Sequence, residues 1–138
     1  MIGTNPYNKY REIQVATATP GQLLLMLYDG AIRFTREAGA ALTAGQIEES
    51  NRLLQRAQDV LAELMSTLNP DAGQIAQNLY SLYEYMQRRL IEANIKKDPQ
   101  AAEEVLGLLS GLREAWAEAV HSYGNRARVV NGLNVGGL

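Results

Sequence analysis

Cysteine is absent from the 138-residue sequence, histidine occurs once, and the net charge is only -2. Without cysteine there is no disulfide framework and no thiolate chemistry, which fits a reducing compartment and makes the cytoplasm the expected location. The small net charge gives no general attraction to nucleic acid or anionic lipid, because such binding normally shows as an excess of Lys and Arg. Nucleic acid is therefore not an expected partner.

Long apolar runs are also missing. The longest, Leu23 to Tyr28, has six residues, whereas a helix that spans a bilayer needs about 20. The N-terminal stretch "MIGTNPYNKYREIQ" has neither the apolar region nor the small-residue cleavage site of a secretory signal. We expect no membrane insertion and no export by that route.

The residues that usually carry catalysis or bind metals are scarce. His121 is expected to be a solvated residue near a helix end, where a positive charge suits the helix dipole. There is no pair of Glu-x-x-His motifs, no Gly-rich phosphate loop and no nucleophile motif. We expect no enzymatic activity, no metal site and no cofactor.

Four amphipathic segments and their end signals predict an all-α protein. A capping box from Thr19 to Gln22, with Pro20 at the first helical position, predicts the start of a helix that ends near Leu42, where Gly45 can supply the left-handed residue. A second capping box is expected from Asp71 to Gln74, and Asp98 caps a helix that begins at Pro99. The predicted helices are 20–42, 46–68, 72–95 and 99–121.

The connections between these helices are only a few residues long, which favours an antiparallel up-down four-helix bundle over residues 19–121. Residues 1–18 carry enough apolar surface to dock as a short N-terminal segment. Residues 122–138 contain four glycines and are expected to form a flexible tail.

Two of the predicted helices have more apolar surface than a bundle core needs. The helix at 20–42 has a conventional core stripe and a second stripe formed by Leu25, Tyr28 and Ile32. The helix at 72–95 has a core line that includes Ile75, with Tyr83 at its edge, while two further residues, Tyr80 and Ile91, lie well to one side.

These extra stripes allow two interpretations. They could pack against one another and against residues 1–18, or they could form a groove that receives a foreign apolar segment, since contiguous exposed apolar surface usually marks a binding site. Tyrosine suits such a groove, because its ring gives contact area at little cost in rotamer entropy and its hydroxyl tolerates water.

Two blocks of the sequence resemble one known family. These are "NPYNKYREIQVATATPGQLLLMLYDGAIRF" at 5–34 and "NLYSLYEYMQRRLIEANIKKD" at 78–98. Over about residues 5–120 the chain is similar to the FliS family, the bacterial flagellar export chaperones that hold flagellin before secretion. The resemblance implies a helical bundle that binds the C-terminal segment of flagellin and prevents its premature polymerisation.

The resemblance also implies roles for particular residues. Residues 1–18, including Tyr7 and Tyr10, would cap the apolar cleft and move aside for flagellin, and both tyrosines match positions that dock the loaded chaperone to the flagellar export gate. The expected cleft residues are Leu25, Tyr28, Ile32, Tyr80, Tyr83 and Ile91.

Several alternatives stay open at this stage. Asp29, Arg88, Arg89 and Asn94 could bind the client or brace the bundle, for example by a salt bridge from the arginines to Asp29 or Glu84. The second functional hypothesis is a homodimeric helical adaptor or regulator that binds another amphipathic segment.

Overall fold

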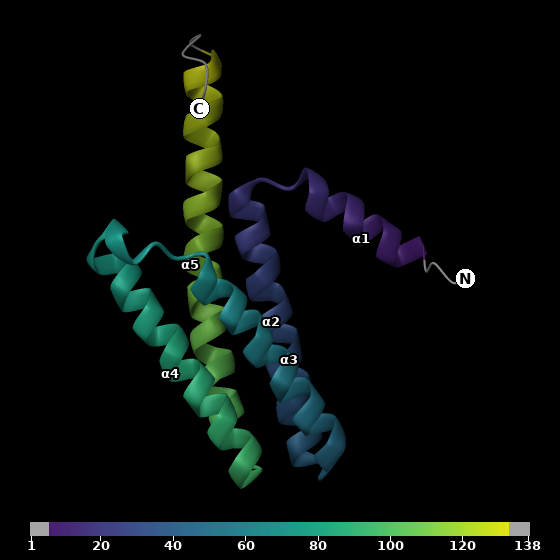
Figure 1. Cartoon of the computed structure of the whole chain (residues 1–138). Helices are drawn as coiled ribbons and strands as arrows, with labels where there is room; N and C mark the ends of the chain where they lie inside the picture. The colour runs from purple at the N-terminus through teal and green to yellow at the C-terminus, as the bar shows by residue number, and fades with distance from the viewer. Residues whose placement is uncertain (1–5, 133–138) are drawn as a thin grey trace.

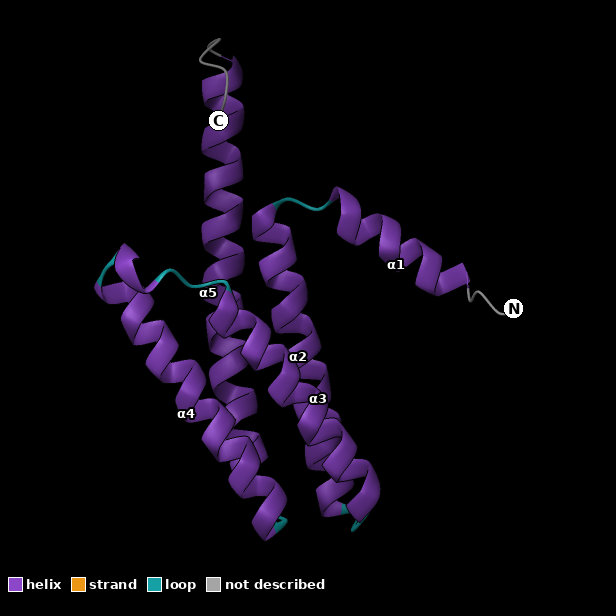
Figure 2. Cartoon of the chain, in the orientation of Figure 1, coloured by secondary structure: helices purple, strands orange, loops and turns teal. Residues whose placement is uncertain are grey.

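The structure, a computed structural model, describes the backbone of residues 6–132 and the side chains of residues 6–122 except those of residues 7, 14 and 15. This part of the chain contains helices and no β-strand (Figure 2). The elements in chain order are α1 (Pro6–Thr17), α2 (Pro20–Thr43), α3 (Ile47–Ser66), the 3-10 turn η1 (Pro70–Ala72), α4 (Gln74–Lys96) and α5 (Pro99–Gly132).

The four helices α2 to α5 form the predicted bundle (Figure 1). Helix α2 packs against α3 and α5, and α4 packs against the same two helices. Helices α2 and α4 therefore lie on one diagonal of the bundle, with α3 and α5 on the other. Because short turns join successive helices, neighbours are antiparallel, as expected for an up-down bundle.

Local signals place several helix ends correctly. The Gln22 N–H donates to Thr19 Oγ1 at 3.1 Å, and the Thr19 N–H donates to Gln22 Oε1 at 2.9 Å, so the capping box is present. Gly45 adopts the expected positive φ of 72° after α2. At the start of α5 the Gln100 N–H donates to Asp98 Oδ1 at 2.9 Å.

The predicted capping box at Asp71 and Gln74 is wrong. Residues 70–72 form the separate turn η1, in which the Asn69 side chain accepts a hydrogen bond from the Asp71 N–H at 3.0 Å. Gly73 then adopts a φ of 118°, a conformation that is open to glycine and interrupts the helical path. Helix α4 begins directly after this break.

The ends of the chain also differ from expectation. Helix α5 continues to Gly132 instead of ending near His121, because extending an existing helix needs no new nucleus and one glycine costs only about 1 kcal/mol. Residues 133–138 of the predicted tail lie outside the described residues. Helix α1 extends away from the bundle (Figure 1) and does not cover it.

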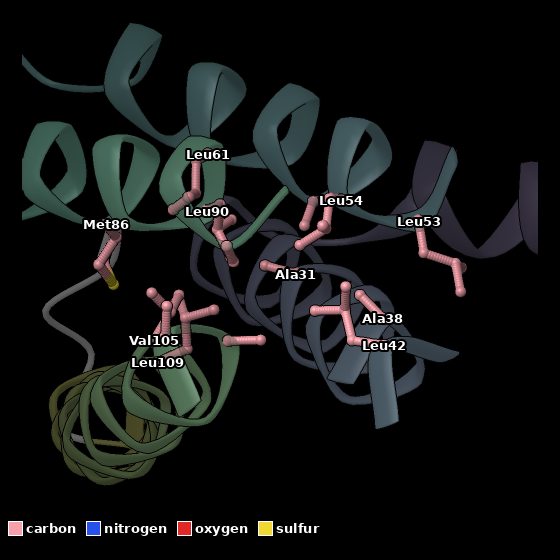
Figure 3. Close-up of a cluster of buried hydrophobic side chains, with 14 of the residues drawn as sticks. Ala31, Ala38, Leu42, Leu53, Leu54, Leu61, Met86, Leu90, Val105 and Leu109 are labelled. Carbon is pink, nitrogen blue, oxygen red and sulfur yellow. The ribbon is translucent and has the colours of Figure 1, made fainter. Parts of the chain in front are cut away.

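Small residues let α2 approach both of its neighbours closely. A Cβ atom added at Gly30 would lie 4.0 Å from Val60 of α3, and one added at Gly39 would lie 3.9 Å from Ala102 of α5. Leucines and other apolar side chains from all four helices fill the space between them (Figure 3). The buried alanines, leucines and Met86 thus form one continuous core.

Two tyrosines meet inside this core. Tyr28 of α2 and Tyr83 of α4 are at most 1% exposed, and their hydroxyl groups are hydrogen-bonded to each other across the diagonal. Trp116 of α5 donates its Nε1–H to Tyr28 Oη at 3.2 Å. Burial raises the pKa of both tyrosines, so the two hydroxyls stay protonated.

Replacing Tyr28 with Phe should lower the free energy of unfolding by about 2 kcal/mol, and replacing Tyr83 with Phe by about 1 kcal/mol. Tyr28 Oη has two partners, whereas Tyr83 Oη has one. Equilibrium unfolding in urea measures the difference. Tyr80→Phe is the matched control on α4, because Tyr80 is 44% exposed, and it should change stability by less than about 0.5 kcal/mol. A larger loss from Tyr83→Phe than from Tyr28→Phe would contradict this assignment.

Candidate functional site

Helix α4 has an exposed apolar side that the core does not use. Tyr80 and Ile91 are each 44% exposed, and Ile95 is 76% exposed. At 100° per residue they lie on the side of α4 that points away from Met86 and Leu90, together with Glu84 and Arg88. We refer to Tyr80, Glu84, Arg88, Ile91 and Ile95 as the α4 face.

The edge of the α4 face borders α3. The Gln87 side chain donates to the Gln58 carbonyl oxygen at 3.1 Å, and Asn94 Nδ2 donates to Asn51 Oδ1 at 2.7 Å. Gln87 and Asn94 lie between the core line of α4 and the α4 face on the helix surface. A segment bound to the α4 face would therefore also contact the outer surface of α3.

Leu25 and Ile32 lie elsewhere, on the side of α2 that packs against α5. The same side carries Asp29, whose Oδ1 accepts a hydrogen bond from Arg113 Nε of α5 at 2.9 Å. Leu25 and Ile32 are half-buried. Because α2 and α4 are diagonal, the structure does not bring these two residues together with Tyr80 and Ile91 in one cleft.

Tyr28 and Tyr83 were expected in the cleft, but the structure buries both at the bundle axis. Their side chains point toward each other, and the paired hydroxyls make an interior position tolerable for a polar group. No partner can reach them in this conformation. Of the N-terminal pair, Tyr10 is 62% exposed on α1, and the side chain of Tyr7 lies outside the described residues.

Ile75 is a further correction, because it was expected in the core and is 76% exposed. It lies in the first turn of α4, where the buried residues of that helix have not yet begun. In the opposite direction, Ile95 was not predicted as an exposed apolar residue. Its position in the last turn of α4 is the feature of the sequence that could have indicated this exposure.

Three of the four residues left open by the sequence brace the bundle. Asp29 joins α2 to Arg113 of α5, Arg89 Nε donates to Glu104 Oε1 of α5 at 2.7 Å, and Asn94 joins α4 to Asn51 of α3. The expected bridges from the arginine pair to Asp29 or Glu84 are absent from the described residues. Arg88 instead lies with its guanidinium carbon 5.8 Å from the Tyr85 ring centroid.

A small charged cluster links α4 to α5. Tyr85 Oη donates to Glu104 Oε2 at 2.5 Å, and this hydrogen bond, together with the one from Arg89 Nε, lowers the pKa of the Glu104 carboxyl group. Lys96 and Arg89 lower the pKa of Glu92 in the same way. A carboxyl group whose pKa is lower in the folded state stabilises the fold above its unfolded pKa, and this contribution disappears as the pH falls through the folded pKa.

Glu104→Gln should therefore weaken the fall in stability on acidification. The variant lacks a carboxylate whose pKa lies below the ordinary 4.5. At neutral pH its free energy of unfolding should therefore be lower than that of the wild type, and this difference should shrink at acidic pH. Urea unfolding at a series of pH values measures this. Glu103→Gln removes the same charge at the preceding position of α5 and serves as the control, and equal profiles for Glu104→Gln and wild type would refute a role for the cluster.

The described residues hold no candidate metal site and no candidate membrane span. No group of three or more His, Cys, Asp or Glu side chains in this part of the chain could hold a metal ion. Within the same residues, no helix is both long enough and apolar enough to cross a membrane. The exposed apolar surfaces on α1 and α4 are the features that the bundle leaves without a structural role.

Comparisons with a family model and with individual known proteins agree on one family. Residues 3–123 match the family model described as flagellar protein FliS. The flagellar secretion chaperone FliS of Bacillus subtilis is 42% identical over 118 residues, covering 86% of this chain and 88% of the relative. The protein of the same name from Salmonella typhimurium is 41% identical over 109 residues, covering 78% and 81%.

A solved structure supports the fold. The chain is similar to one described as a flagellar chaperone from bacteria, with a TM-score of 0.70 and 16% sequence identity. The similarity covers 86% of this chain and 99% of the solved one.

Proposed function

The chain belongs to the FliS family of flagellar secretion chaperones, and from this premise we propose that it binds the C-terminal segment of flagellin. Binding in the cytoplasm would prevent premature polymerisation and deliver flagellin to the flagellar export apparatus. Members of this family are chaperones and not enzymes.

The observation that carries the proposal is the α4 face. Tyr80, Ile91 and Ile95 expose large apolar side chains on the outside of the bundle, where they add nothing to the core. Large apolar side chains that stay exposed together on one side of a helix mark interaction sites on proteins. An amphipathic helix recognises such a surface by laying its own apolar side against it, with anchors three or four residues apart.

The positions of the apolar residues set a limit on how a client can bind. A single helix on the α4 face cannot also contact Leu25 and Ile32, because these lie on the side of α2 that faces α5. A client that uses both surfaces has to extend around the bundle. A segment that is disordered before binding can do this, and the entropy lost on ordering keeps its affinity below what the buried area alone would give.

Tyr80→Ala and Ile91→Ala should each weaken binding of a flagellin C-terminal peptide by about tenfold, the usual effect of truncating an interface anchor. The melting temperature should change little, because both side chains are 44% exposed. Isothermal titration calorimetry and thermal denaturation measure the two effects.

Ile75→Ala provides the matched control for these variants. Ile75 is an exposed apolar residue of α4 that lies outside the α4 face, so its truncation should not affect the peptide. Pull-down with flagellin that lacks its C-terminal segment should recover nothing. Equal losses for all three variants, or capture of the truncated flagellin, would argue against the proposal.

The N-terminal segment is proposed to regulate access to the apolar surface. In the structure α1 lies away from the bundle, with Tyr10 62% and Ile13 56% exposed, which is the arrangement expected of an open state. In a closed state α1 would cover the apolar surface of the empty chaperone. Tyr7 and Tyr10, once released by the client, are proposed to dock the loaded chaperone to the export gate.

Deleting residues 1–18 should tighten binding of the flagellin peptide. Only open molecules bind, so the measured affinity is proportional to the fraction of molecules that are open. A segment closed about nine-tenths of the time would give a gain of about tenfold. Tyr10→Ser combined with Ile13→Ser in the full chain should reproduce part of this gain. Unchanged affinity in titration calorimetry for both variants would remove the N-terminal segment from the mechanism.

A further inference from the structure

The half-buried ring of Phe34 in α2 holds two arginine side chains. The Arg33 guanidinium carbon lies 4.8 Å from the ring centroid, and that of Arg56, which comes from α3, lies 5.3 Å from it. Both distances are typical of a cation–π contact. Both arginines are exposed, and neither has an ion-pair partner among the described residues. Two positive charges from two helices therefore share one ring.

Acidic residues at suitable spacing do not neutralise these arginines. Glu37 follows Arg33 by four residues, and Asp59 follows Arg56 by three. Ion pairs along a helix often form at these spacings, but neither of these two pairs is formed. The two guanidinium carbons are no farther apart than the sum of their distances to the ring centroid, which is about one Debye length at 0.1 M salt. The two charges repel each other, and a bound anion would remove this repulsion.

We infer that Phe34, Arg33 and Arg56 form a docking site for an acidic segment of a partner protein. We refer to these three residues as the Phe34 site. Each guanidinium presents N–H donors in a fork that binds a carboxylate through two parallel hydrogen bonds. Two carboxylate residues one turn apart on a helix have Cβ atoms about 5–6 Å apart, so one such pair can bind both arginines at once.

The contacts with the ring prepare the two arginines for this role. A free arginine side chain samples many rotamers, and binding has to order it at a cost in entropy. Phe34 restricts both guanidiniums before a partner arrives, one from its own helix and one from α3. The site therefore also requires α2 and α3 to be packed together, so it exists only in the folded bundle.

The surroundings of the Phe34 site favour a short acidic segment over a polyanion. Glu49, Asp59 and Glu63 lie on the same side of α3 as Arg56, and the net charge of the chain is -2. Nucleic acid and anionic membranes bind through an extended excess of positive charge. This surface offers two unpaired arginines among carboxylates, which suits a partner with a few acidic side chains.

The Phe34 site lies apart from the α4 face. At 100° per residue, Arg56 and Asn51 are about 140° apart around α3, and the Asn51 side chain contacts Asn94 of α4. The Phe34 site is thus on the α2 side of α3, whereas the α4 face borders the other side. The inference does not depend on the proposed flagellin binding, and an acidic partner on the Phe34 site leaves the α4 face uncovered.

NMR titration of the full chain tests this inference. Phe34 is the only phenylalanine in the sequence, so isotope-labelled phenylalanine gives ring signals that report on this site alone. The probe is a helical peptide with two Glu residues four positions apart, and its matched peptide has Gln at both positions. The Glu peptide should shift the Phe34 signals to saturation, with an affinity that falls as salt is added. The Gln peptide should not shift them.

Arg33→Gln and Arg56→Gln should each weaken binding of the Glu peptide by about fivefold, the effect of losing one exposed ion pair. Arg33→Lys should restore only part of the affinity, because an ammonium group cannot bind a carboxylate in the same two-pronged way. Arg36→Gln is the control, since it removes the same charge from an exposed position of α2 that points away from Phe34. It should bind the peptide like the wild type, and urea unfolding checks that every variant is folded.

Several results would overturn the inference. Absence of binding by the Glu peptide, or equal shifts with the Gln peptide, would show that the arginines do not recognise carboxylates. An equal loss of affinity in Arg36→Gln would show that only the total charge matters. Tighter binding of inorganic phosphate or of a short oligonucleotide than of the Glu peptide would assign the site to phosphate groups and not to an acidic protein.

Discussion

The hydrogen bond between the Tyr28 and Tyr83 hydroxyls holds together two helices that do not otherwise form a packed pair. Helices α2 and α4 lie on a diagonal of the bundle, so this contact crosses the axis, and Trp116 extends it to α5. Buried hydroxyls without partners would cost about 1–3 kcal/mol each. Because each has a partner, the core can hold two bulky polar rings and still fix the relative positions of three helices.

With the inner side of α4 fixed in this way, its outer side is free for other uses. Tyr83 and Tyr80 are three residues apart on the same helix, yet one is 1% exposed and the other 44%. The same side chain is used in two ways: the hydroxyl of Tyr83 is satisfied inside the core, whereas Tyr80 combines an apolar ring with a hydroxyl that water can reach. The proposed client surface depends on this division of α4.

The polar contacts between helices are suited to alignment more than to stability. Asp29 with Arg113 and Arg89 with Glu104 are partly exposed pairs, and pairs of this kind contribute about 0–1 kcal/mol each. Their value lies in setting how far each helix can slide or rotate along its neighbour. Apolar packing around the small residues of α2 supplies the larger part of the stability.

Local signals in the sequence were sufficient to predict the four-helix bundle and several helix ends. The box at Thr19 and the turn at Gly45 depend only on nearby residues, so both could be recognised. Tyr28 and Tyr83 could not be placed, because a helical pattern gives the direction of a side chain on its own helix and not the position of the hydroxyl that it will meet. Leu25 and Tyr80 were assigned to one cleft for the same reason, since the order of helices around the axis is set by the whole core.

Trp116 is the only tryptophan in the chain, and its indole N–H donates to the hydroxyl at the centre of this contact. Its intrinsic fluorescence therefore originates at one defined point of the molecule. Any shift of α2 or α4 that disturbs the tyrosine pair would alter the polarity and hydrogen bonding around the indole, and with them the wavelength and lifetime of its emission. The bundle thus contains a built-in optical reporter of its own axis, which needs no attached dye.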